Sequence, residues 1–156
     1  MRLPALLSLA ILLSGCFTGI SPLQRVSDVS RETNLATRFG QVEVAMRHVD
    51  PTARPEFLSR RSDWGKGIRV LEIETAGITI VDEEHATVAL DVSWSSLTDS
   101  MLRTTQIIQN WDNKKVGWVL TRERRLSGEP GLFGEAITQL TPPHPDVHRP
   151  SRTLGN

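Results

Sequence analysis

The sequence contains no tyrosine, has a single cysteine and carries no net charge. One cysteine excludes an internal disulfide and a zinc site built from cysteines. The 18 basic side chains balance 18 acidic ones, whereas nucleic-acid-binding domains usually carry a basic excess on one face, so we expect no nucleic-acid partner. A hydrophobic share of 38% with 23% charged residues is typical of a globular domain. The 156 residues allow one domain of about 100 residues with flanking segments.

The single cysteine follows an apolar run at the N-terminus. Met1-Arg2 supplies one positive charge, the stretch from Leu3 to Leu13 is apolar, and Ser14-Gly15 leads into Cys16. As a helix this stretch would cover roughly half of a ~30 Å hydrocarbon core. Residues 1–15 are therefore predicted to be a cleaved signal peptide and not a membrane span.

The tetrapeptide Leu13-Ser14-Gly15-Cys16 resembles the lipobox of bacterial lipoproteins. The resemblance implies cleavage between Gly15 and Cys16, a diacylglycerol on the thiol of Cys16 and acylation of its new amine. Each buried methylene contributes about 0.8 kcal/mol, so two or three acyl chains make release from the membrane negligible. Phe17 favours the outer membrane, on the side facing the periplasm, because retention at the inner membrane goes mainly with Asp at that place. An ordinary signal peptide that ends near a cysteine is the alternative.

The rest of the chain divides into a tether, a domain and a tail. Residues 16–31 mix Gly, Ser and Pro with scattered apolar residues and are predicted to be a lipidated tether. Residues 32–126 carry the apolar patterning of a folded domain. Residues 127–156 are rich in proline, and we expect disorder from about residue 141. The apolar segment 131–134 is expected to fold back onto the domain.

The first half of the domain predicts two helices. Apolar residues recur every three to four positions over 35–49 and predict the first helix, with an alternating strand over 42–48 as the alternative. Pro51 ends this element, because the residue before a proline leaves the α region. Asp50 is expected to cap a second helix that runs to about Asp63.

The second half predicts four long strands joined by short turns. The expected strands cover residues 68–81, 86–94, 101–111 and 116–124. The first is interrupted at Ala76-Gly77, the second alternates most cleanly between apolar and polar residues, and 112–115 is expected to be a hairpin loop. We therefore predict an α+β fold, with two N-terminal helices packed on a curved antiparallel sheet of about four long strands.

Two short motifs carry a resemblance to a fold family. Gln109-Asn110-Trp111 lies near the end of the third strand, and Gly117-Trp118-Val119-Leu120 opens the fourth. With this order of elements, residues 33–126 resemble the nuclear transport factor 2-like or SnoaL-like α+β cone, while a cystatin-like topology is also possible. Enzymes of the cone family keep a pocket between the concave face of the sheet and the helices, with an Asp, His or Tyr inside. Its usual third N-terminal helix is expected to be missing or short here.

The sequence predicts no catalytic residue, no metal site and no cofactor. His48 is interpreted as a surface or capping histidine at the end of the first helix. Asp91 alternates out of phase with its apolar neighbours and is expected to face away from them. The cluster 82–85 contains His85 and three acidic residues, and it is interpreted as a polar turn and not as a cation site. His144 and His148 lie among prolines that argue against a helical zinc site.

The aromatic and charged residues of the strands are interpreted structurally. Trp94, Trp111 and Trp118 are predicted to belong to the core or to line a pocket. The charged run 122–125 is interpreted as a solvated strand edge.

The sequence is consistent with two functional hypotheses from different classes of protein. The first is a membrane-anchored bacterial envelope lipoprotein that serves as a non-catalytic accessory or protein-interaction module. The alternative is a small-molecule-binding or enzymatic SnoaL-like domain with a pocket between sheet and helices. The lack of converging ionisable residues favours the first. Its expected partners are the membrane, through the lipid anchor, and an envelope protein.

Overall fold

The computed structural model describes residues 19–137. The predicted signal peptide, the acylation site at Cys16 and the predicted disordered tail lie outside these residues. Within the described range, no helix is both long enough and apolar enough to cross a membrane.

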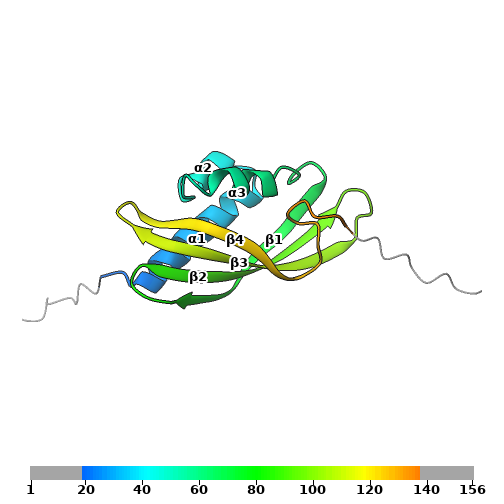
Figure 1. Ribbon diagram of the computed structural model, residues 1–156. Coiled ribbons are helices and arrows are strands. Elements are labelled where there is room, and N and C mark those ends of the chain that lie inside the picture. The colour runs from blue at the N-terminus through cyan, green and yellow to red at the C-terminus, as the bar shows by residue number, and fades with distance from the viewer. Residues whose placement is uncertain (1–18, 138–156) are drawn as a thin grey trace, which may run out of the picture.

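Three helices precede a four-stranded antiparallel sheet, whose strands lie in the order β1-β2-β3-β4. The elements are α1 (Pro22–Arg38), α2 (Val42–Met46), α3 (Arg54–Arg60), β1 (Ile68–Ile80), β2 (His85–Ser96), β3 (Leu102–Lys114) and β4 (Gly117–Gly128). Figure 1 shows a curved sheet with α1 lying across one face and with α2 and α3 together near one edge. The predicted α+β fold is confirmed, with three helices in place of the two predicted, one of which is the short α2 of five residues.

Helix α1 begins at Pro22, inside the segment 16–31 that we predicted to be a tether. The side chain of Ser21 caps the helix by accepting a hydrogen bond from the amide of Gln24 at 3.2 Å, and Pro22 stands where proline suits a helix start. The buried face consists largely of small or polar residues, among them Ser30 and Thr33. A search for apolar periodicity misses such a face, which is why the prediction of the tether was wrong for residues 22–31.

The predicted continuous helix over 35–49 is broken at Gly40. Helix α1 ends at Arg38, and Gly40 adopts a φ of 74°, a left-handed conformation that glycine takes at little cost. Only residues 42–46 of the remainder form a helix, and Val49 then makes a single bridge to Leu120 of β4. The alternative strand over 42–48 is therefore also wrong.

Asp50 does not cap α3, which begins at Arg54 after Ala53. One of its carboxylate oxygens instead accepts hydrogen bonds from the amide of Thr52 at 3.0 Å and from its hydroxyl. The other oxygen accepts from Lys114 Nζ at 2.5 Å. The bonds from Lys114 and Thr52 lower the pKa of Asp50 to about 2. This cluster joins the turn before α3 to the end of β3.

The Asp50–Lys114 contact makes a pH-dependent contribution to stability. The pKa of Asp50 is lower in the folded chain than the ~3.9 of an unfolded one, so the contribution is complete above about pH 5 and disappears as the pH falls towards 2. We expect Lys114→Met to lower the free energy of unfolding near neutral pH, and the deficit to shrink as Asp50 becomes protonated. Urea unfolding at a series of pH values measures this, with Lys115→Met as the control. A deficit that is constant over this range would contradict the assignment.

The sheet follows the predicted pattern most closely in β2, whose residues alternate strictly between buried and less buried positions. Strand β1 shows the interruption expected near Ala76-Gly77 and a second one near Leu71. Strand β3 is longer than predicted, because Asp112 to Lys114 pair with β4. The expected loop over 112–115 is therefore wrong, and the turn between β3 and β4 consists of Lys115-Val116.

The core lies between the helices and one face of the sheet. Trp94, Trp111 and Trp118, which the sequence places in the core or in a pocket lining, are all buried in this cluster. Trp94 Nε1 donates a hydrogen bond to Thr105 Oγ1 at 2.9 Å, whereas Trp111 Nε1 is buried without a partner among the described residues.

The segment Gly131–Gly134 packs on this core as predicted. Leu132 is completely buried, and its carbonyl oxygen accepts a hydrogen bond from Trp64 Nε1 at 2.9 Å. The residues after β4 therefore belong to the folded domain up to this point.

Candidate functional site

A chain of buried polar side chains runs through the interior beneath the helices. Asn34 of α1 and Gln109 of β3 exchange two amide hydrogen bonds, at 3.0 and 3.1 Å. Gln109 Nε2 also lies 3.3 Å from a carboxylate oxygen of Glu123 in β4. Both oxygens of Glu123 accept from the guanidinium of Arg61, which follows α3. The chain of contacts thus links all layers of the fold.

The Arg61–Glu123 ion pair is almost completely removed from solvent. The side chains are 3% and 4% exposed, and the guanidinium carbon of Arg61 lies 3.7 Å from the centre of the Phe57 ring. The backbone carbonyl of Glu123 accepts a further hydrogen bond from Arg60. Paired in this way, the two charges can be tolerated in the interior, whereas either one alone could not.

A β-bulge at Thr121 explains why Glu123 faces inward. Trp111 of β3 pairs with Leu120, but its neighbour Asn110 pairs with Arg122, so Thr121 is an extra residue in β4. An extra residue reverses the alternation of the strand beyond it. Glu123 therefore takes the buried place, and the prediction that the whole run 122–125 is a solvated edge was wrong at this position.

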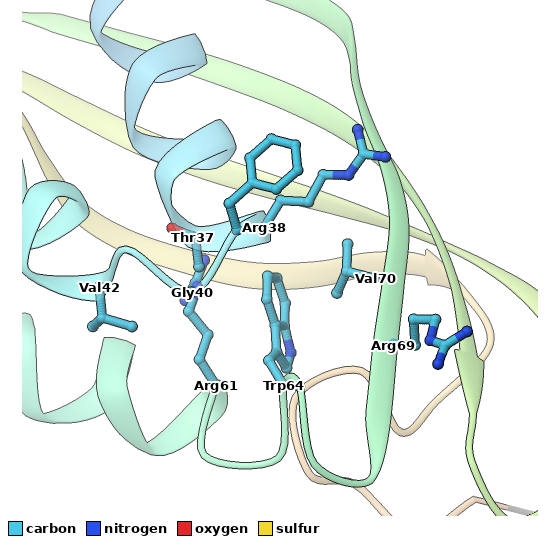
Figure 2. Close-up of a pocket in the computed structure, with 10 residues that line it drawn as sticks. Thr37, Arg38, Gly40, Val42, Arg61, Trp64, Arg69 and Val70 are labelled. Carbon is cyan, nitrogen blue, oxygen red and sulfur yellow. The ribbon is translucent and has the colours of Figure 1, made fainter.

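A pocket of about 310 Å³ lies where the end of α1 faces the start of β1. It is lined by Thr37, Arg38, Phe39, Gly40, Val42, Arg61, Trp64, Gly65, Arg69 and Val70. Figure 2 shows Arg61 and Trp64 extending from the segment after α3 towards the end of α1, with Val70 opposite Trp64. Arg69 extends on the other side of β1 in this view, as expected because consecutive side chains of a strand, here Arg69 and Val70, point to opposite faces.

The lining combines apolar walls with arginine. Phe39, Val42, Trp64 and Val70 supply apolar surface, and the ten lining residues include no carboxylate and no histidine. Arg61 is already paired with Glu123, whereas Arg38 forms no ion pair within residues 19–137 and lies over the Phe39 ring at 5.3 Å. Such a lining can hold an apolar group beside a hydrogen-bond acceptor. It offers no general acid or base.

The sequence did not indicate this pocket, because its residues come from three separated segments. The one signal available was the placement of glycine beside aromatic residues in Phe39-Gly40 and Trp64-Gly65. Glycine is typical of turns, so each pair indicates a turn next to an aromatic side chain.

The titratable residues considered in the sequence lie elsewhere. Asp91 is on the outer face of β2, as predicted, where it accepts a hydrogen bond from Gln106 at 2.9 Å. His48 follows α2 and does not end the first helix, and its Nε2 lies 3.5 Å from Glu32 of α1. His85 bonds to Asp82, which raises the pKa of the imidazole. Across residues 19–137 no three His, Cys, Asp or Glu side chains form a metal-binding group.

A second hollow, of about 370 Å³, lies beside the start of β2 and the end of β3. Its walls include His85, Asp112 and Lys114. The charges there are largely satisfied within the protein, since Lys114 pairs with Asp50 and His85 with Asp82. We therefore consider the pocket at the end of α1 to be the better candidate site.

Comparison with known proteins shows a likeness in structure only. No protein-family model and no curated protein sequence matches the chain. A ketosteroid isomerase-like protein from Erwinia carotovora atroseptica superposes with a TM-score of 0.55 at 9% identity, over 69% of this chain and 98% of the other. A SEC-C motif containing protein from Rhodopseudomonas palustris gives a TM-score of 0.54 at 13% identity, over 64% of this chain and 77% of the other. At these identities the likeness supports a nuclear transport factor 2-like fold and carries no activity.

Proposed function

We propose that this chain is a bacterial envelope lipoprotein, anchored through an acylated Cys16, and that its domain is a non-catalytic binding module. The observation that carries the binding role is the pocket at the end of α1, with its apolar walls and Arg38. Glu123, whose carboxylate oxygens both accept hydrogen bonds from Arg61, is 4% exposed and does not line the pocket, so it is not placed to exchange a proton with a ligand there.

An enzymatic role would require an acid or a base that faces a substrate. The two residues considered for that role, Asp91 and His48, are absent from the pocket lining. Asp91 instead accepts a hydrogen bond from Gln106, and His48 Nε2 lies 3.5 Å from a carboxylate oxygen of Glu32. These positions favour binding over catalysis, because proton transfer needs the group within hydrogen-bond reach of the substrate.

The anchor is proposed from the motif Leu13-Ser14-Gly15-Cys16 and from the apolar run before it. Acyl chains on Cys16 would hold the domain at a membrane without any spanning helix. Phe17 supports placement at the outer membrane, on the periplasmic side.

We expect mass spectrometry of the membrane-extracted chain to show an N-terminal, acylated Cys16. Cys16→Ala should release the chain from the membrane or leave its signal peptide uncleaved, because the acyl acceptor is lost. Phe17→Asp is the matched control, since it should keep the acyl groups while favouring the inner membrane in cell fractionation. Recovery of the wild-type chain as an unmodified species that starts at another residue would refute the anchor.

A further inference from the structure

We propose that the end of the domain at which α1 begins rests on the bilayer, with the β3–β4 turn in contact with the lipid headgroups. This inference rests on the proposed acylation of Cys16 and goes further, because it assigns a lipid-binding surface to the folded domain. We call this surface the membrane-facing end and define it by Ile20, Leu23, Lys115 and Val116.

The distance along the chain from Cys16 to the domain is short. Gly19 is three positions after Cys16, and even a fully extended chain spans only about 3.3–3.6 Å per residue. Gly19 therefore lies within about 10 Å of the acylated residue. Helix α1 begins at Pro22, six positions after Cys16, so by the same spacing its start lies within about 22 Å of the acylated residue.

The strand turns that share this end follow from the topology. Thr37 at the end of α1 and Val70 at the start of β1 line the same pocket, so α1 begins towards the other end of β1. In an antiparallel sheet that other end carries the β1–β2 and β3–β4 turns. The two turns are neighbours, because the backbone amide of Asn113 donates a hydrogen bond to the carbonyl of Glu84 at 2.7 Å. Figure 1 shows the start of α1 and the β3–β4 turn at the same end of the molecule.

The exposed side chains of this end are apolar where polar ones are expected. Val116 is 87% exposed in a two-residue turn, a place usually taken by Asn, Asp or Gly. Ile20 and Leu23 are 61% and 49% exposed at the start of α1. Lys115 beside Val116 can place its ammonium among lipid phosphates while its methylenes lie along the apolar surface.

The adjacent β1–β2 turn differs in character, although it lies at the same end. It contains Asp82, Glu83 and Glu84, all exposed, and anionic side chains are repelled by anionic lipid headgroups. We therefore assign the lipid contact to the Val116 turn and the start of α1, and expect the acidic turn to remain in water.

Site-specific labelling of the acylated full chain tests this contact. After acylation of Cys16 the chain has no free thiol, so one introduced cysteine gives a single label site. The label sites are Val116→Cys on the proposed surface, Glu83→Cys in the acidic turn and Met101→Cys in the β2–β3 turn at the far end. Met101 is a matched apolar control, since it is 54% exposed. A bimane label is read in vesicles of phosphatidylethanolamine and phosphatidylglycerol with nitroxide-labelled headgroups.

We expect quenching of the label at position 116 to exceed that at 101 at least about threefold, with little quenching at 83. With the label moved to Lys115→Cys, the added substitution Val116→Asn should lower quenching while leaving the melting temperature unchanged. Equal quenching at 116 and 101 in a chain shown by mass spectrometry to be acylated would overturn the lipid contact and leave the anchor intact. A chain without acyl groups would overturn both proposals.

Discussion

Glu123→Ala is expected to lower the free energy of unfolding by about 3–5 kcal/mol, the cost of leaving a buried guanidinium without its counter-ion. Arg61 is 3% exposed, and its terminal nitrogens bond to both oxygens of Glu123. The carbonyl of Phe57 is its only other hydrogen-bond acceptor within the described residues. Removing the carboxylate also deprives Gln109 of one acceptor. Urea unfolding of the purified chain measures the loss.

The double variant Arg61→Met/Glu123→Leu distinguishes a buried charge from lost packing. It removes both charges and keeps most of the volume, so it should recover much of the stability that Glu123→Ala loses. Glu56→Ala serves as the control, because it breaks the more exposed pair with Arg60 and should cost only about 0–1 kcal/mol. A double variant as unstable as the single one would show that the charge is not what makes Glu123→Ala destabilising.

Trp94→Ala should cost about 3–5 kcal/mol, because it leaves a cavity in the core near the end of β2. Trp94 is completely buried, and a side-chain atom added at Gly131 would come within 2.9 Å of its ring, so the segment after β4 lies directly against it. The loss should appear as a lower midpoint in thermal unfolding and as earlier proteolysis of the segment around Leu132.

A pair of Trp→Phe variants separates packing from hydrogen bonding at the same residue type. Trp94→Phe removes the donor to Thr105, whereas Trp111→Phe removes a buried donor that has no partner among the described residues. Both substitutions delete the same atoms. We therefore expect Trp94→Phe to be the more destabilising by about 1 kcal/mol or more. The opposite order would mean that the indole of Trp111 has a partner in solution.

The sequence predicted the structure best where the buried side chains are apolar and the more exposed ones are polar. Strand β2 alternates apolar and polar residues on a sheet with one buried face, so the chain itself shows the period of the strand. The helical period of α1 cannot be recognised from apolar residues, because the residues that α1 buries include Ser30, Thr33 and Asn34. Their polar groups are satisfied by bonds such as Thr33 to the Val29 carbonyl, and only the fold shows those bonds.

The candidate site was beyond sequence reasoning for a different physical reason. Whether Glu123 faces inward depends on the single extra residue at Thr121, and no composition rule places a bulge. Arg61 and Glu123 are 62 positions apart, so their pairing is a property of the tertiary structure. The sequence shows the apolar and turn residues of the pocket one by one, but it does not show that the fold brings them together in one place.

Helix α1 also sets the direction from which the pocket can be filled. Its 17 residues rise about 25 Å along the axis, and the pocket lies at the end opposite to the residues nearest Cys16. With Cys16 acylated, as proposed, the helix would place the pocket at the end of the domain away from the anchor. A ligand would then reach the pocket from the aqueous compartment and not by leaving the bilayer, and a protein partner would have to project to that height.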